Sequence, residues 1–286
     1  MAKNMAKKVT VIDNNTTEIF YPSIADVLKD IESAKKHKNI FERSVFGAVA
    51  VGRFNYFDTF EEAEKAFKAG TWQTGIEKLN IAFGAEVKNL EERKRQKMFY
   101  DVVGYQASVP RYLQGLPQNM INSKPVQKKE KIITIVKHIG YLANVTADEI
   151  ISNSAKALAI LNKIEQMGIR CNLDIYSPAE KYGTGIIRIR IKNANERLSV
   201  GKLAFPLANP DMLRRYIFAL RQENVRNSTW DKFNLCYGFG SGVGKTVYNI
   251  DTNKKNLKAV GVENCIFLNN FIKSPEAELK RNNLIK

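Results

Sequence analysis

Three cations alternate with isoleucine near the middle of the chain. Arg188, Arg190 and Lys192 occupy every second position of residues 186–192, and isoleucine fills the places between them. Because successive side chains of a strand point to opposite faces, the three cations are expected on one face, about 7 Å apart. That spacing is close to the distance between neighbouring phosphates, so the pattern predicts contacts to a nucleic-acid backbone. The alternative is a solvent-facing strand whose charges oppose aggregation.

Two further cations, Arg214 and Arg215, belong to an apolar helical pattern. Asn209-Pro-Asp211 opens that helix, with Asn at the N-cap and Pro at the first helical position. Both arginines extend the predicted basic face if the helix lies on the same side as the strand.

Lys245 lies in a glycine-rich stretch, residues 238–246, that ends in Gly244-Lys-Thr246. A phosphate-binding loop requires a glycine, four residues and then Gly-Lys-Ser/Thr, between a strand and a long helix. Phe239 stands where the first glycine is needed, and residues 247–255 are rich in Asn, Asp, Thr and Lys. The stretch is therefore interpreted as a glycine-rich surface loop, in which Lys245 can still contact a phosphate backbone.

Residues for catalysis or metal binding are sparse. His37 lies among lysines, and His138 ends a predicted strand without a Ser, Cys or carboxylate partner nearby in the sequence. Both are interpreted as non-catalytic, His37 at the surface and His138 in a structural role. The cysteines at 171, 236 and 265 form no close pair, which favours reduced thiols. We expect no catalytic residue, no metal and no cofactor, although a nucleotide-dependent or nuclease activity through Lys245 stays open.

The elements that position these residues follow from hydrophobic periodicity. Residues 131–136 are an apolar, β-branched run typical of a strand buried on both faces. Residues 151–167 repeat apolar side chains at helical spacing, Gly168 follows as a C-terminal cap, and residues 169–176 and 186–192 alternate like strands. This order of strand, helix, strand and strand predicts an α/β fold.

The N-terminal part is predicted to be a separate mixed α+β region over residues 1–122. It contains two short strands at 9–12 and 18–21, a helix from Ser23 to Ala34, and a helix that the capping box Thr59-Phe-Glu-Glu62 opens. A helix or helix pair broken near Gly84 follows, and then a strand from 99 to 109 that Gly104 interrupts. The polar, lysine-rich residues 123–130 are the predicted linker to a basic domain over 131–286.

The charge of the chain is strongly positive. Its 45 Lys and Arg exceed its 29 Asp and Glu by 16, and residues 123–286 contribute 13 of that excess. Such a potential attracts polyanions, of which nucleic acid is the first candidate and an acidic protein the next. No run of apolar residues is long enough for a membrane span, and the N-terminus lacks a signal-peptide core, so a cytoplasmic protein is expected.

The order of elements in residues 131–273 resembles a von Willebrand A-type α/β domain. That family carries a metal-dependent adhesion motif, Asp-x-Ser-x-Ser, directly after its first strand. The corresponding stretch here is His138-Ile-Gly-Tyr-Leu-Ala-Asn144, which lacks the motif. The resemblance therefore implies a sheet flanked by helices and a binding platform without the metal.

Several phrases are also similar to an uncharacterised family of tailed-phage proteins. They are Phe60-Glu-Glu-Ala-Glu-Lys-Ala-Phe67 with Gly70 and Trp72, residues 101–117, and Leu213-Arg-Arg-Tyr216. The resemblance implies a phage-encoded protein in the host cytoplasm and no particular activity.

These observations predict a non-enzymatic, phage-encoded protein that binds DNA or RNA by backbone contacts. The predicted contact residues are Arg188, Arg190, Lys192, Arg214, Arg215 and Lys245. The alternative is a structural or assembly protein whose basic face meets an acidic protein of the phage or host. The sequence does not indicate an oligomeric state.

Overall fold

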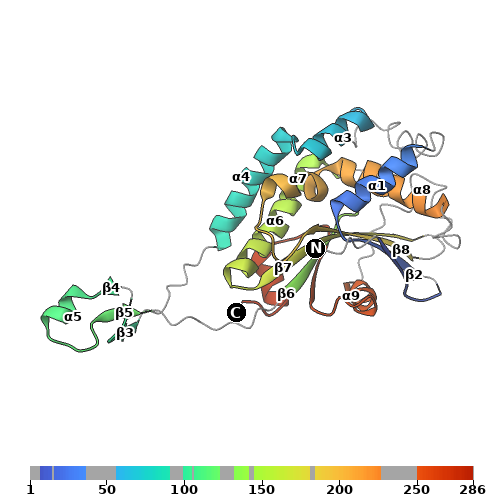
Figure 1. Cartoon of the computed structure of the whole chain (residues 1–286). Coiled ribbons are helices and arrows are strands. Elements are labelled where there is room, and N and C mark those ends of the chain that lie inside the picture. The colour runs from blue at the N-terminus through green and yellow to red at the C-terminus, as the bar shows by residue number, and fades with distance from the viewer. Residues whose placement is uncertain are drawn as a thin grey trace. The chain divides into compact units, whose positions relative to one another are not determined.

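A computed structural model of the chain describes residues 7–14, 16–36, 56–90, 99–104, 106–122, 132–141, 145–180, 184–226 and 250–285. The chain divides into two compact units. The larger comprises Met1–Leu90 and Ile132–Lys286, and the smaller comprises Glu91–Lys131. Figure 1 labels the elements of both.

The larger unit is built on a six-stranded, mainly parallel sheet with the order β1-β2-β8-β7-β6-β9. Its strands are β1 (Lys8–Val11), β2 (Thr16–Tyr21), β6 (Ile132–His138), β7 (Arg170–Glu180), β8 (Thr184–Lys192) and β9 (Cys265–Leu268). The pairs β2–β8, β6–β7 and β6–β9 are parallel, whereas β1–β2 and β7–β8 are antiparallel. The predicted strands at 131–136, 169–176 and 186–192 are confirmed.

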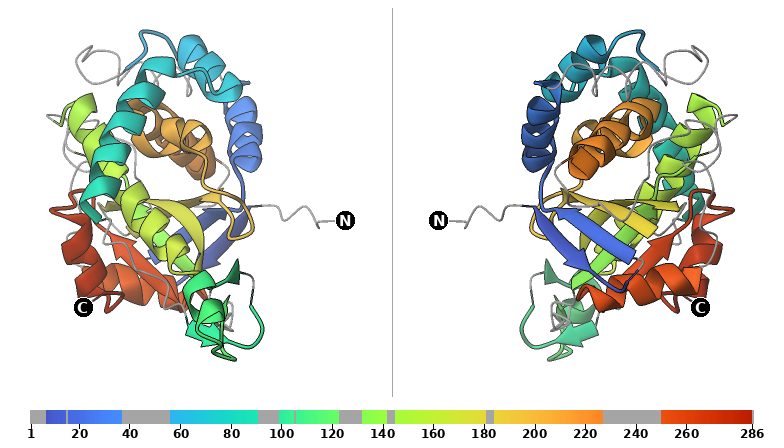
Figure 2. Two further views of the ribbon diagram at one scale, coloured as in Figure 1. Left: turned by 90° about the vertical axis from the view of Figure 1, so that its left-hand side faces the viewer. Right: turned by 90° about the vertical axis from the view of Figure 1, so that its right-hand side faces the viewer.

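Helices cover both faces of this sheet. On the first face lie α1 (Ile24–Lys35), α3 (Phe60–Ala69), α4 (Gln73–Leu90), α6 (Ala147–Gln166), α7 (Val200–Ala208), the π-helix η1 (Met212–Ile217) and α8 (Phe218–Arg226). Helix α9 (Ile250–Ala259) lies on the second face (Figure 1), and α10 (Pro275–Arg281) packs beside α6. Figure 2 shows α1 beside α8. The mixed α/β class with flanking helices is thus confirmed. None of the helices in the described ranges is long and apolar enough to cross a membrane.

Local signals in the sequence explain where several helices begin and end. Thr59 and Glu62 form the predicted capping box of α3, and Gly70 ends that helix with a φ of 63°. Helix α6 begins at Ala147 with a second capping box, Thr146 with Glu149, four residues before the start predicted at 151. Helix α4 runs unbroken from Gln73 to Leu90, so the predicted break near Gly84 is wrong.

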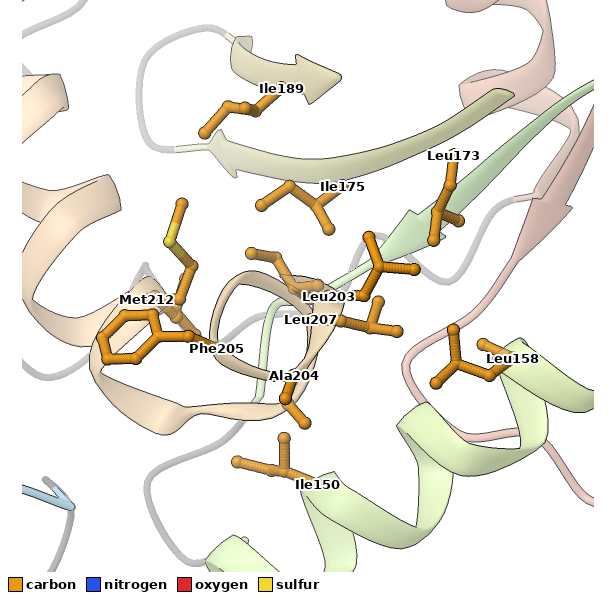
Figure 3. Packing of buried hydrophobic residues seen from close by; sticks show 14 of the residues in the cluster. Ile150, Leu158, Leu173, Ile175, Ile189, Leu203, Ala204, Phe205, Leu207 and Met212 are labelled. Carbon is orange, nitrogen blue, oxygen red and sulfur yellow. The ribbon is translucent and has the colours of Figure 1, made fainter. Parts of the chain in front are cut away.

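The strands of the sheet place apolar side chains on both faces. Figure 3 shows α7 between α6 and β7, with Leu203 and Leu207 of α7 close to Leu173 and Ile175. A second apolar cluster on the other face joins β6, β7, β8 and β9 to α9; it contains Val136, Tyr176, Ile186, Leu257 and Phe267. Both faces of the central strands are therefore buried, as continuous apolar strands in parallel sheets are.

The observed division of the chain differs from the one predicted at residue 122. Strand β2 pairs in parallel with β8, and its Ile19 and Tyr21 are fully buried in the same core as the C-terminal helices. Phe67 of α3 stacks on Phe205 of α7 at 4.5 Å. The N-terminal elements thus complete the large unit, because β8 needs a further strand at its free edge, and local patterns do not reveal so distant a pairing. The predicted linker, residues 123–130, lies outside the described residues.

The smaller unit is a three-stranded antiparallel sheet of order β3-β5-β4 with one short helix. Its elements are β3 (Phe99–Asp101), β4 (Gln106–Ala107), α5 (Val109–Leu113) and β5 (Met120–Asn122). A Cβ at Gly104 would lie 2.2 Å from the Ile121 carbonyl oxygen. The predicted interruption of the strand at Gly104 is therefore explained by a close backbone approach that only glycine allows.

Candidate nucleic-acid interface

Arg188 and Arg190 point to one face of β8, as their alternation predicts, but that face is buried. The Arg188 guanidinium donates to Glu18 Oε1 and Asp174 Oδ2, at 2.7 Å each, and its side chain is 5% exposed. Arg190 pairs with the same Asp174 and keeps 18% of its side chain exposed. The expectation of an exposed basic strand face is wrong for these two residues, because neighbouring strands supply carboxylates.

The strand register explains this pairing. Arg188 stands opposite Phe20 of β2 and Tyr176 of β7, and Arg190 stands opposite Asp174. The Arg188 guanidinium also lies 3.9 Å from the centre of the Phe20 ring. Burial disfavours the charged form, but Glu18 and Asp174 outweigh that effect and raise the pKa of Arg188.

Lys192 at the end of β8 is also held inside the fold. It is 2% exposed, and its ammonium group donates to Glu165 Oε1 of α6 at 2.6 Å and to the Cys171 carbonyl at 3.0 Å. The side chain links β8 and β7 to the end of α6, so the prediction of a solvent-facing Lys192 is wrong as well.

Arg215 and Arg214 lie in the π-helix η1, on the first face of the sheet, and do not join the strand cations. Arg215 is 1% exposed; it pairs with Asp211 at 3.1 Å and donates to the carbonyls of Phe57 and Asp58. Arg214 is 7% exposed, with Val145 O at 3.5 Å from its Nη2. The predicted extension of the basic face by these residues is therefore wrong. Lys245 lies outside the described residues.

Helix α9 carries the cations that the sequence interpretation missed. Its inner face is fixed by Leu257, which is fully buried, and by Asn253, whose Oδ1 accepts a 3.0 Å hydrogen bond from the Tyr176 hydroxyl. The opposite face presents Lys254, Lys255 and Lys258, of which Lys255 and Lys258 are exposed and Lys254 is half-buried. We call these three side chains the α9 lysine surface.

The α9 lysine surface is not neutralised within the described parts of the chain. No described carboxylate forms an ion pair with Lys254, Lys255 or Lys258. The neighbouring cations of α10 differ in this respect, because Lys280 pairs with Glu276 at 2.7 Å and Arg281 with Glu278 at 2.5 Å. Positions three and four apart on a helix are neighbours about 5–6 Å apart, so the three ammonium groups can follow adjacent phosphates.

Two pKa shifts show that the field of this surface reaches its surroundings. Burial raises the pKa of the Cys265 thiol, and Lys254 and Lys258 oppose that rise. Burial likewise raises the pKa of Glu278, whereas the positive charges of Arg281, Lys137 and Lys254 oppose that rise.

Helix α9 was not predicted from the sequence because Leu257 is its one large apolar side chain after Ile250. The signal that could have predicted this helix is its charge distribution: the acidic Asp251 lies in the first turn and the basic Lys258 in the last, the arrangement that the helix dipole favours.

His138 is enclosed at the carboxyl end of β6. Its Nδ1 accepts a 3.1 Å hydrogen bond from the Gly140 amide, and its ring packs near Tyr176 and Phe267. Burial, with smaller effects of Lys137 and Arg221, lowers the pKa of His138 to about 3. A Cβ at Gly140 would lie 2.6 Å from His138 Cε1, so glycine is required for this turn.

The described residues contain no group of His, Cys, Asp and Glu side chains that could hold a metal ion.

This geometry defines a mixed α/β protein with one mainly parallel sheet and a lysine-bearing helix on its second face. Residues 5–275 match the family described as a domain of unknown function, DUF7192, and the chain belongs to that family. No curated protein and no solved structure gives a significant match.

Proposed function

We propose that the protein binds nucleic acid without enzymatic turnover, by contacts between the α9 lysine surface and the phosphate backbone. The observation that carries the proposal is the set of three lysines on the outer face of one helix, without ion pairs to described carboxylates. The net charge of +16 supports it, because a positive field speeds encounters with a polyanion. The residues first predicted from the strand and from η1 are not part of this proposal.

The proposal implies a definite salt dependence. Each phosphate neutralised by a lysine adds about 0.9 to the slope of log affinity against log salt for duplex DNA. Three contacts therefore weaken binding by about 40-fold between ~50 mM and ~200 mM salt. Contacts from outside the described residues would add to this slope.

The test compares binding of a fluorescent DNA duplex and a single-stranded RNA by anisotropy at several salt concentrations. In the triple variant Lys254→Gln, Lys255→Gln and Lys258→Gln, we expect affinity at low salt to fall by at least tenfold and the salt slope to decrease by about 2.7. Undetectable binding by the unchanged protein, or an unchanged slope in the variant, would refute the proposal.

A matched variant separates the surface from bulk charge. Lys65, Lys88 and Lys202 are exposed lysines of α3, α4 and α7, on the other side of the sheet. Replacing these three with glutamine lowers the net charge by the same amount, and we expect it to change affinity less than threefold. Equal losses in both triple variants would mean that only the total charge matters.

The second candidate is a structural or assembly role in which the chain meets an acidic protein of a phage or its host. The small unit favours a protein contact, because Val109, Tyr112 and Leu113 are each more than 60% exposed there. Co-purification of a protein partner with no nucleic-acid absorbance would support this candidate over the first.

The finer fold assignment and the phage origin are part of the same proposal. The adjacent order β8-β7-β6-β9, with α6 between β6 and β7 and an antiparallel β8, supports a von Willebrand A-like core. An experimental structure superposed on such a domain tests the fold, and genes for capsid or tail proteins beside this one test the origin.

A further inference from the structure

The small unit, Glu91–Lys131, exposes most of the apolar side chains that the structure describes in it. Within residues 100–104 and 106–122, the only buried residue is the polar Ser108, and Met120 and Ile121 of the central strand β5 are half-buried. Seven large apolar side chains are 36–77% exposed: Tyr100, Val102, Val103, Val109, Tyr112, Leu113 and Leu116. The described part of the unit therefore has no apolar core of its own.

The contacts that order the unit lie at its surface. The Arg111 guanidinium lies 4.3 Å from the centre of the Tyr100 ring, and its Nε donates a 2.8 Å hydrogen bond to the Gln118 carbonyl. The Asn122 side-chain amide donates to the Val103 carbonyl at 3.0 Å. Such exposed contacts contribute little stability, because water competes for the same groups. A small sheet of this kind becomes stable only when an apolar face is covered.

A unit of about 40 residues without a core is usually stabilised by a disulfide, by a metal or by association with another chain. Residues 91–131 contain no cysteine and no histidine, and Asp101 is the one acidic residue between 99 and 122. Neither a disulfide nor the usual set of metal ligands can therefore form within the sheet and helix of the unit. Association is the remaining way to cover the apolar side chains.

The charge and the edges of the unit indicate what covers it. Residues 99–122 carry one negative charge, Asp101, and one positive charge, Arg111, so their net charge is zero. Phosphates and acidic proteins gain no attraction there, whereas two copies of a chain of net charge +16 meet little repulsion at this surface. Strands β3 and β4 form the two edges of the sheet, and the backbone of an edge can pair with a further strand. Lipid cannot supply those hydrogen bonds.

We propose that the small unit is a self-association module, in which the seven exposed apolar side chains pack against the same surface of a second copy of the chain. If each side chain contributes about 100 Å², one copy buries ~700 Å², close to the roughly 800 Å² per partner of a stable interface. Tyrosine and arginine, present here as Tyr100, Tyr112 and Arg111, are enriched in such interfaces. The proposal does not depend on nucleic-acid binding by α9.

Sedimentation equilibrium of the full chain, treated with nuclease, tests self-association. We expect a dimer with a Kd in the micromolar range or tighter. In the double variant Tyr112→Ser and Leu113→Ser, we expect self-association to weaken at least tenfold, because both side chains are lost from each copy. The control is Val11→Ser with Ile81→Ser, which removes two similarly exposed apolar side chains of the large unit. This control should change the Kd less than twofold.

A further chain keeps the test decisive if the double variant unfolds the small unit. It replaces residues 91–131 with a Gly/Ser linker, and we expect it to be monomeric at every concentration. The proposal is overturned by an unchanged protein that stays monomeric up to ~100 µM, by undiminished association of the double variant, or by a dimer that persists in the linker chain.

An anionic membrane is the alternative occupant that the same variants examine, because lysine and arginine flank the unit at 93–97 and 124–131. A monomeric protein that sediments with phosphatidylserine vesicles, and loses this binding in the double variant, would assign the surface to lipid and overturn the proposal. These measurements contain no nucleic acid, so their failure would leave the proposed contacts of the α9 lysine surface unaffected.

Discussion

Four charged side chains lie together on the second face of the sheet: the buried Glu18 of β2, Asp174 of β7 and Arg188 of β8, and the partly buried Arg190 of β8. Removing an ion from water costs several kcal/mol, and only close, hydrogen-bonded partners offset this. Two positive and two negative charges leave the network neutral, so the fold tolerates it. Removing one member alone is expected to destabilise the fold, because it leaves an uncompensated charge in the interior.

Asp174 is the member whose loss is expected to matter most. It is fully buried and contacts both arginines. Asp174→Asn keeps the shape but leaves Glu18 alone opposite two guanidinium groups, so we expect the free energy of unfolding to fall by about 3–5 kcal/mol. Urea unfolding measures this loss. Asp148→Asn removes the exposed partner of Lys78 and should cost less than about 1 kcal/mol. Similar costs at both positions would contradict the importance of burial.

His138 predicts how stability depends on pH. Its folded-state pKa of about 3 lies below the usual value of 6.5, so between these values the unfolded chain binds more protons than the folded one. The stability contributed by the neutral ring is therefore complete above pH ~6.5 and lost as the pH falls toward ~3. From pH ~6.5 to pH ~4.5 this loss amounts to about 2 kcal/mol.

The variant His138→Asn isolates this contribution. The amide oxygen can replace Nδ1 as acceptor for the Gly140 amide, but the side chain does not titrate. The variant will be less stable at every pH because it loses packing against Tyr176 and Phe267. The change in unfolding free energy between the two pH values should nevertheless be smaller than in the unchanged protein, as urea unfolding at each pH can show. An identical pH dependence would contradict a neutral, buried imidazole.

At the scale of elements, those with strong local signals were predictable. The capping box at Thr59 and the isoleucine alternation of β8 each specify an element from neighbouring residues alone. The pairing of β2 with β8 was not predictable, because it joins residues about 170 positions apart that share no local pattern. The face of β8 that carries Arg188 could be derived from the alternation, but its burial depends on that distant pairing.

Helix α9 illustrates the opposite case, an element with a weak local signal and exposed cations. Leu257 alone anchors it among large apolar side chains, so periodicity did not separate it from a polar loop. The same composition leaves its outer face free to carry Lys255 and Lys258. The candidate interface was therefore missed for the reason that makes it accessible: few of its residues contribute to the core.

At the scale of the whole molecule, the positive charge of the C-terminal half was read as one surface of a separate domain. The structure shows that part of this charge is internal. Arg188 and Lys192 form ion pairs with other elements, whereas Arg215 pairs with the nearby Asp211 and donates hydrogen bonds to the carbonyls of Phe57 and Asp58. Glu18, which neutralises Arg188, comes from the N-terminal part of the chain. The division of the chain and the burial of its charges are thus linked, since the predicted boundary at residue 122 would separate Glu18 from Arg188, and Phe57 and Asp58 from Arg215.

Two shortened chains test this division. One replaces residues 91–131 with a flexible Gly/Ser linker of about 20 residues, which can span tens of ångströms. Because the six-stranded sheet and its core come from the remaining residues, we expect a cooperative urea transition with a free energy of unfolding within about 2 kcal/mol of the full chain. The other contains residues 131–286 alone. It lacks β2, α1, α3 and α4, so it leaves Arg188 without Glu18 and exposes the apolar surfaces of β8 and α7. We expect no cooperative transition for it.

The opposite outcome would be a stable fragment 131–286 together with an unfolded linker variant. It would support the domain boundary predicted from the sequence, because only a C-terminal domain with its own complete core could fold without β2.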